Sequence, residues 1–138
     1  MKFHNLALQE KIKRGINHIE KENLDEAKII FEELKNNKQT ENTGLFFLGI
    51  INIKKKNLIL AKDLFNKILI NEPNNPDANL NLGLVYLEEK NNEKAINFFD
   101  KVIKEDKNNL NAIYHKGLAN FLCKNYNDTI VSLEKCID

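Results

Sequence analysis

Apolar residues recur at intervals of three and four along the chain, with polar residues between them. Ile12, Ile16 and Ile19, for example, fall on one face of a helix. The same periodicity predicts eight helices, over residues 4–21, 25–37, 42–56, 58–71, 76–90, 93–105, 110–124 and 127–137. Only two prolines and five glycines interrupt the 138 residues. This scarcity of helix breakers also favours an all-α fold.

Several positions repeat with a fixed period of 34 residues. Four glycines are spaced by this period: Gly15, Gly49, Gly83 and Gly117. Each is followed by an Asn eight residues later, at Asn23, Asn57, Asn91 and Asn125. A small residue follows at Ala27, Ala61, Ala95 and Thr129, and then a large apolar one at Phe31, Phe65, Phe99 and Leu133. The pattern predicts one domain, residues 1–138, with repeats at 8–41, 42–75, 76–109 and 110–138.

Each repeat is interpreted as two helices joined by a turn. The Asn tolerates the left-handed conformation that ends a helix, and it forms local hydrogen bonds in turns. The glycine and the small residue let the two helices approach closely, and the large apolar residue fills the space beside them. Between repeats, Pro73 cannot continue the preceding helix, and Pro76 suits the first turn of the next one.

The sequence resembles the tetratricopeptide repeat family, whose repeat is also 34 residues long. The third repeat matches the family signature at Leu82, Gly83, Tyr86, Ala95 and Phe99. The second repeat matches it at Leu48, Gly49, Ala61, Phe65 and Pro73. The first repeat departs from it at Lys11, Arg14 and His18, and the fourth at Lys116 and Thr129. The resemblance implies a right-handed α-solenoid of four helix-turn-helix repeats, with a concave face lined by the first helix of each.

The resemblance also indicates which residues line that concave face. The fifth, ninth and twelfth positions of the repeats are all apolar or aromatic: Ile12, Ile16, Ile19, Phe46, Ile50, Ile53, Leu80, Leu84, Leu87, Tyr114, Leu118 and Phe121. Asn81 and His115, at sixth positions, complete the candidate groove. Part of this stripe is alternatively core between the two helices of a repeat.

The sequence therefore predicts a non-catalytic protein–protein interaction scaffold in which the groove binds a helical or extended apolar peptide segment. The alternative is a structural module that self-associates through the groove or through its open C-terminal end. The fourth repeat reaches Asp138 without a following capping helix. Its last helix carries Ile130, Val131, Leu133, Cys136 and Ile137, more apolar surface than its partner helix covers. We expect this end to be covered, by the same end of a second copy in a homodimer or by further residues.

One familiar function of the family is not expected. Adaptors for heat-shock chaperones bind an acidic tail with Lys, Asn and Arg at set groove positions. The corresponding residues here are Ile12, Ile16, Phe47, Asp77 and Asn81, or Phe46, Ile50, Asn81, Asn111 and His115. Neither set contains a Lys or an Arg, so the sequence predicts no such clamp.

Composition and charge exclude further classes of partner. Lys and Arg total 21 against 20 Asp and Glu, and Arg14 is the one arginine. This balance predicts no nucleic-acid partner. The most apolar stretch, residues 45–53, is far shorter than the roughly 20 residues that cross a membrane. We interpret it as a helix buried on both sides, with no membrane insertion. The N-terminus has no apolar run typical of a signal peptide, so we expect a cytoplasmic protein.

The sequence contains no constellation of catalytic or metal-binding residues. His4, His18 and His115 belong to different repeats. Cys123 and Cys136 do not form a CxxC pair and lack the partners of a zinc site. We expect both cysteines to be reduced thiols in the core, and we expect neither enzymatic activity, nor a metal, nor a cofactor.

Overall fold

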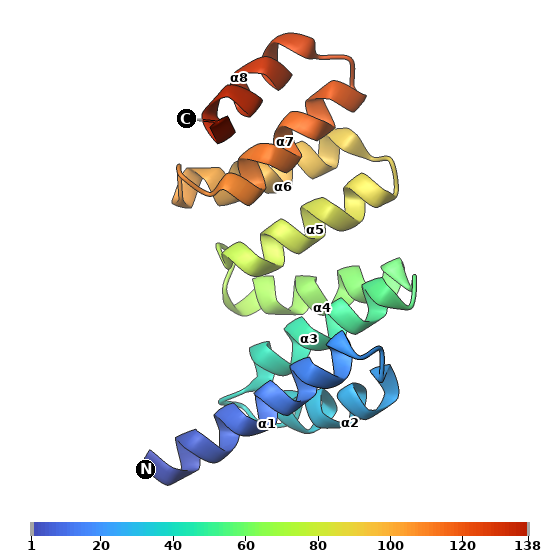
Figure 1. Cartoon of the computed structure of the whole chain (residues 1–138), viewed down its shortest axis with the longest axis vertical. Helices are drawn as coiled ribbons and strands as arrows, with labels where there is room; N and C mark the ends of the chain where they lie inside the picture. The colour runs from blue at the N-terminus through green and yellow to red at the C-terminus, as the bar shows by residue number, and fades with distance from the viewer. Residues whose placement is uncertain (1, 138) are drawn as a thin grey trace. The chain divides into compact units, whose positions relative to one another are not determined.

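The computed structural model describes residues 2–137, with side chains from residue 5 onward. These residues form eight helices and no strand. The helices are α1 (Lys2–Glu20), α2 (Leu24–Lys35), α3 (Glu41–Lys54), α4 (Leu58–Asn71), α5 (Pro76–Glu88), α6 (Asn92–Glu105), α7 (Leu110–Leu122) and α8 (Tyr126–Ile137) (Figure 1). All eight predicted helices are confirmed, with ends shifted by at most two residues.

The chain divides into two compact units, Met1–Lys67 and Ile68–Asp138. In the first unit α2 packs against both α1 and α3. In the second unit α6 packs against both α5 and α7, and α8 packs against α7 (Figure 1). In both units, therefore, the second helix of one repeat is covered by its own first helix and by the first helix of the next repeat.

The turn inside each repeat differs from the prediction in one respect. The left-handed residue is not the Asn but the residue before it. These residues have φ between 60° and 62°: Glu22, Lys56, Lys90 and Lys124. In the third repeat the Lys90 N–H donates to the Leu87 carbonyl at 3.0 Å, and the Asn91 N–H donates to the Tyr86 carbonyl at 2.8 Å. These two bonds form a Schellman motif, which satisfies carbonyls at the end of α5.

The Asn that follows begins the second helix instead of ending the first. The Asn91 side-chain oxygen accepts a hydrogen bond from the Lys94 N–H at 3.3 Å, so Asn91 is the N-cap of α6. Asn57 accepts in the same way from the Leu60 N–H at 3.3 Å. Asn is among the residues preferred at N-caps because its side chain satisfies a free backbone donor.

This turn leads to a first prediction. A residue with a Cβ atom costs about 1–2 kcal/mol in the left-handed conformation, whereas Gly enters it freely. Replacing Lys90 by Gly is therefore expected to raise the free energy of unfolding by about 0.5–1 kcal/mol, after the greater flexibility of Gly in the unfolded chain is deducted. Urea unfolding followed by circular dichroism measures the change. Lys90→Ala removes the same charge but keeps the Cβ atom, and an equal gain in that control would refute the backbone explanation.

In the first three repeats the glycine faces an aromatic ring. Phe31, Phe65 and Phe99 are fully buried, and each ring lies against the glycine of its own repeat. A Cβ atom on Gly83, for instance, would lie 2.5 Å from Cε1 of Phe99. In these three repeats a side chain on the glycine would overlap the Phe ring. The glycine is therefore required by the ring, and not only by the close approach of the two helix backbones.

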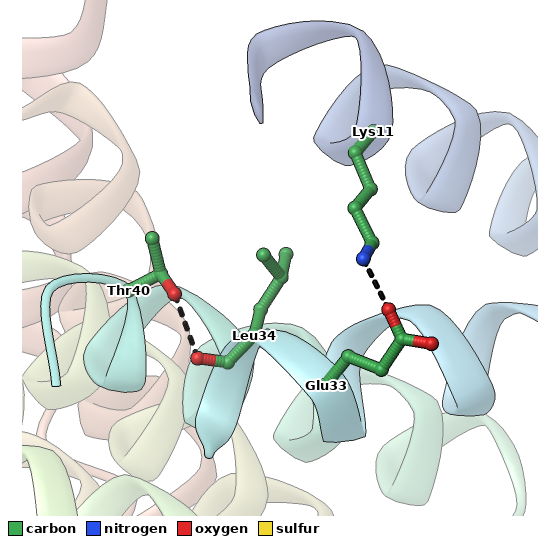
Figure 2. Close-up of polar contacts among 4 residues, drawn as sticks. All are labelled: Lys11, Glu33, Leu34 and Thr40. Carbon is green, nitrogen blue, oxygen red and sulfur yellow. Dashed lines mark hydrogen bonds and ion pairs between the residues drawn. The ribbon is translucent and has the colours of Figure 1, made fainter. Parts of the chain in front are cut away.

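Polar contacts also connect the helices of the first unit. Lys11 on α1 forms an ion pair with Glu33 on α2 (Figure 2). The Thr40 hydroxyl, just before α3, donates to the Leu34 carbonyl at 2.8 Å (Figure 2). This bond satisfies one of the carbonyls that α2 leaves free at its end.

Helix α3 contains the most apolar stretch of the sequence. Leu45, Leu48 and Ile51 are buried, and Phe46 and Ile50 on other faces of the helix are half-buried. The interpretation of this stretch as a helix covered on more than one side is confirmed. Across residues 2–137, every helix is too short or too polar to span a membrane.

The two cysteines are free, as expected, but the prediction that they lie in the core is wrong. Cys123 is exposed because it follows the last turn of α7, at the C-cap. Cys136 is half-buried near the end of α8, and its thiol lies 3.9 Å from the Leu110 carbonyl oxygen.

Candidate functional site

The apolar residues predicted to line the groove lie on α1, α3, α5 and α7, the first helices of the four repeats. Their exposure differs along the chain. Ile19 is buried, and Tyr114 and Phe121 on α7 are about half exposed. The others are half-buried: Ile12, Ile16, Phe46, Ile50, Ile53, Leu80, Leu84, Leu87 and Leu118.

Part of this stripe contributes to the core, as the alternative interpretation held. In the second unit, Leu80, Leu84 and Leu87 on α5 pack against a buried cluster. That cluster comprises Ala95, Phe99, Val102, Ala112 and Ala119. The α5 residues therefore stabilise the packing of α5, α6 and α7, and only their remaining exposed surface is available to a partner.

The fourth repeat brings its predicted groove residues together in a pocket between α7 and α8. The pocket has a volume of about 230 Å³ and is lined by Tyr114, Gly117, Leu118, Phe121, Thr129 and Leu133. None of these side chains is charged. The Thr129 hydroxyl is already engaged, since it donates to the Asn125 carbonyl at 2.9 Å. The lining is thus apolar and aromatic, as is typical of pockets that bind apolar groups.

The pocket lies at a repeated position where the fourth repeat differs from the others. Leu133 stands where the earlier repeats have Phe31, Phe65 and Phe99. The three Phe side chains are fully buried, whereas Leu133 is 37% exposed. A Cβ atom on Gly117 would lie 3.6 Å from the nearest Leu133 atom, so no ring fills the space beside this glycine. Sequence reasoning grouped these four residues as large and apolar, and it missed the space that the smaller one leaves.

The two polar groove candidates are bonded to their own helices. The Nδ1 atom of His115 lies 2.8 Å from the Asn111 carbonyl oxygen. Because a carbonyl can only accept, Nδ1 carries the proton in this hydrogen bond. The Asn81 amide donates to the Asp77 carbonyl at 2.8 Å. The His115 ring also packs near Phe99, with ring centroids 5.9 Å apart, so its first role is in the packing of α7.

Two of the residues that depart from the family signature form ion pairs. Lys116 on α7 lies 2.6 Å from Asp100 on α6. Lys11 pairs with Glu33, and the hydrogen bond from its ammonium group, together with its charge, lowers the pKa of the Glu33 carboxyl below its ordinary value. Glu33 is exposed, so this pairing contributes little to stability. Both lysines have structural partners and do not form a cationic site.

Among residues 5–137, whose side chains the structure describes, no group of His, Cys, Asp and Glu residues is suited to a metal ion. His18 lies in the first unit and His115 in the second. The His4 side chain lies outside the described residues.

The family described as "Anaphase-promoting complex, cyclosome, subunit 3", which consists of tetratricopeptide-type repeats, matches residues 55–136. The chain belongs to this family. The comparison with curated proteins found no match.

Several solved structures show the same fold. A crystal structure of MamA has a TM-score of 0.78 and 20% sequence identity, over 99% of this chain and 74% of that one. MamA from Desulfovibrio magneticus RS-1 has a TM-score of 0.80 and 21% identity, over 95% and 74%. A tetratricopeptide repeat protein from Parabacteroides merdae has a TM-score of 0.78 and 21% identity, over 94% and 52%. The predicted all-α helical-repeat solenoid fold is confirmed.

Proposed function

We propose that this tetratricopeptide repeat chain is a non-catalytic, cytoplasmic scaffold that binds a helical or extended apolar segment of another protein. The family supports a role in protein–protein interaction. The proposed contact surface is the exposed part of the first-helix residues in each unit, and in the second unit it includes the pocket between α7 and α8. The observation that carries the proposal is the exposure of Tyr114 and Phe121 at the rim of an uncharged pocket.

Exposed aromatic side chains beside a hollow are typical of binding sites. Tyr114 is 49% exposed and Phe121 is 52% exposed. Aromatic residues are enriched at protein interfaces because they bury a large area at a low cost in side-chain entropy. The apolar lining has no charged side chain that could pair with a charged group, and such a group would lose its hydration on entering the pocket. An apolar segment is therefore the ligand class that the pocket suits best.

The proposal predicts that binding depends on α7. Peptides selected from a random library for binding to the chain are expected to be apolar and to contact this surface. The double substitution of Tyr114 and Phe121 by Ser should weaken their binding about tenfold or more, since a central aromatic contact contributes about 2 kcal/mol. Fluorescence anisotropy with labelled peptides measures the affinities.

The matched control is Ile29→Ser. Ile29 is also well exposed, but it lies on α2, a second helix outside the proposed groove. This change should leave peptide affinity unaltered. Equal affinity of the selected peptides for the double variant and the unmodified chain would exclude α7 as the binding surface.

A second candidate function, self-association, is favoured by the outer surface of α8. Ile130, Val131 and Ile137 on this helix are all more than half exposed. A second copy that covered this surface would form a homodimer. Sedimentation over a range of concentrations distinguishes the two candidates: a persistent monomer contradicts self-association, and a dimer lost in Ile130→Ser supports it.

A further inference from the structure

The first three repeats indicate which kind of group the pocket in the fourth repeat can hold. In each of the first three repeats a phenyl ring lies against the repeat glycine and is fully buried. In the fourth repeat the glycine is retained as Gly117, but the ring is absent because Leu133 takes its place. The space beside this glycine is part of the pocket of about 230 Å³ that opens between α7 and α8.

We propose that this pocket is a socket for one aromatic side chain, a Phe supplied by the bound partner. The proposal rests on the proposed function, in that the partner segment lies across α7. An apolar cavity of about 150 Å³ is large enough to bind benzene, so the pocket has room for a phenyl ring. The incoming ring then lies beside Gly117 and Leu133, the positions at which the other repeats have their glycine and their Phe.

The lining supports an aromatic occupant over a charged or strongly polar one. None of the six lining residues carries a charge, and the Thr129 hydroxyl is satisfied by the Asn125 carbonyl. The rim adds two aromatic rings, Tyr114 and Phe121. Phe121 is already held edge-to-face by Tyr126, with ring centroids 5.8 Å apart. Aromatic rings pair favourably in edge-to-face and offset arrangements, so these rings provide a further contact for an incoming phenyl group.

A small probe tests the socket without knowledge of the partner. N-acetyl-phenylalaninamide is titrated into chain labelled at its methyl groups, with N-acetyl-alaninamide as the matched probe that lacks the ring. The phenylalanine probe is expected to shift the methyl resonances of Leu118, Thr129 and Leu133 saturably, and the alanine probe is not. Absence of these shifts with the phenylalanine probe overturns the proposal.

Substitution of the lining residue provides the second arm of the experiment. Leu133→Phe supplies the missing ring from the chain itself, as in the other three repeats, and should weaken binding of the probe at least about tenfold. Val131→Phe adds the same ring two residues away on α8, at a position that does not line the pocket, and should leave binding unchanged. Leu118→Phe enlarges a second, half-buried lining side chain and should also weaken binding, which keeps the test valid if Leu133→Phe fails to fold. Undiminished binding to a folded Leu133→Phe variant overturns the proposal.

These outcomes separate the socket from the function on which it rests. If the probe binds in the pocket but selected peptides ignore Tyr114 and Phe121, the proposed function fails. If selected peptides depend on α7 but the probe does not shift the three methyl groups, the function holds and the socket is wrong.

Discussion

Replacing Phe99 by Ala is expected to lower the free energy of unfolding by about 3–5 kcal/mol, the range for removal of a buried aromatic side chain. Phe99 is completely buried in the cluster that joins α5, α6 and α7. Its removal would leave a cavity beside Gly83, which has no side chain to fill it. Urea unfolding followed by circular dichroism gives the free energy, and the helical signal of the folded variant shows that the secondary structure remains.

The same substitution in the fourth repeat is the control. Leu133 occupies the equivalent position, but it is 37% exposed and borders a pocket that is already open. Leu133→Ala removes fewer buried atoms and creates little new cavity, so its cost should be about 1 kcal/mol. Equal losses for the two variants would mean that the ring column does not determine packing in the way we describe.

The helices and the repeat could be predicted from the sequence because both depend on periodicity. The spacing of apolar residues decides which side of each helix is buried, and that spacing is visible without coordinates. The exact turn was harder to predict. Asn91 is a residue that favours both the left-handed conformation and the N-cap, and the sequence does not distinguish the two roles. The backbone places the left-handed residue at Lys90, a residue type with no preference for that conformation.

The sequence predicted which residues line the candidate site, but it did not predict the pocket between α7 and α8. The positions of Tyr114, Leu118 and Phe121 follow from the helical period of α7. Which part of the stripe is buried depends on neighbouring helices, and Leu84 is half-buried against the core for that reason. The pocket includes Leu133, which is smaller by a few carbon atoms than the Phe residues at this position in the other repeats. Such a difference has meaning only when the ring's surroundings are known.

The second large effect is expected at Gly44, a glycine that is not one of the four repeated glycines. Gly44 lies in the first turn of α3, where this helix passes the end of α2. A Cβ atom there would overlap the backbone of Lys35 and the carbonyl oxygen of Phe31. These are backbone atoms, which cannot move aside as a flexible side chain can. The equivalent positions in later repeats are the buried small residues Ala78 and Ala112, so the sequence did contain a signal that this position must be small.

Gly44→Ala is therefore expected to reduce the free energy of unfolding by about 3 kcal/mol, the upper part of the usual range for overpacking. The better helix propensity of Ala, worth about 1 kcal/mol, offsets only part of the clash. Gly117→Ala is the matched control, because the three atoms nearest to its Cβ atom would be side-chain atoms, with the Ser132 Cβ atom first at 3.0 Å. There the gain in propensity should nearly balance the contact, and the midpoint of urea unfolding should hardly move. A neutral result at Gly44 would show that α3 can shift away from α2 at little cost, and the close approach of these two helices would then not be a requirement of the fold.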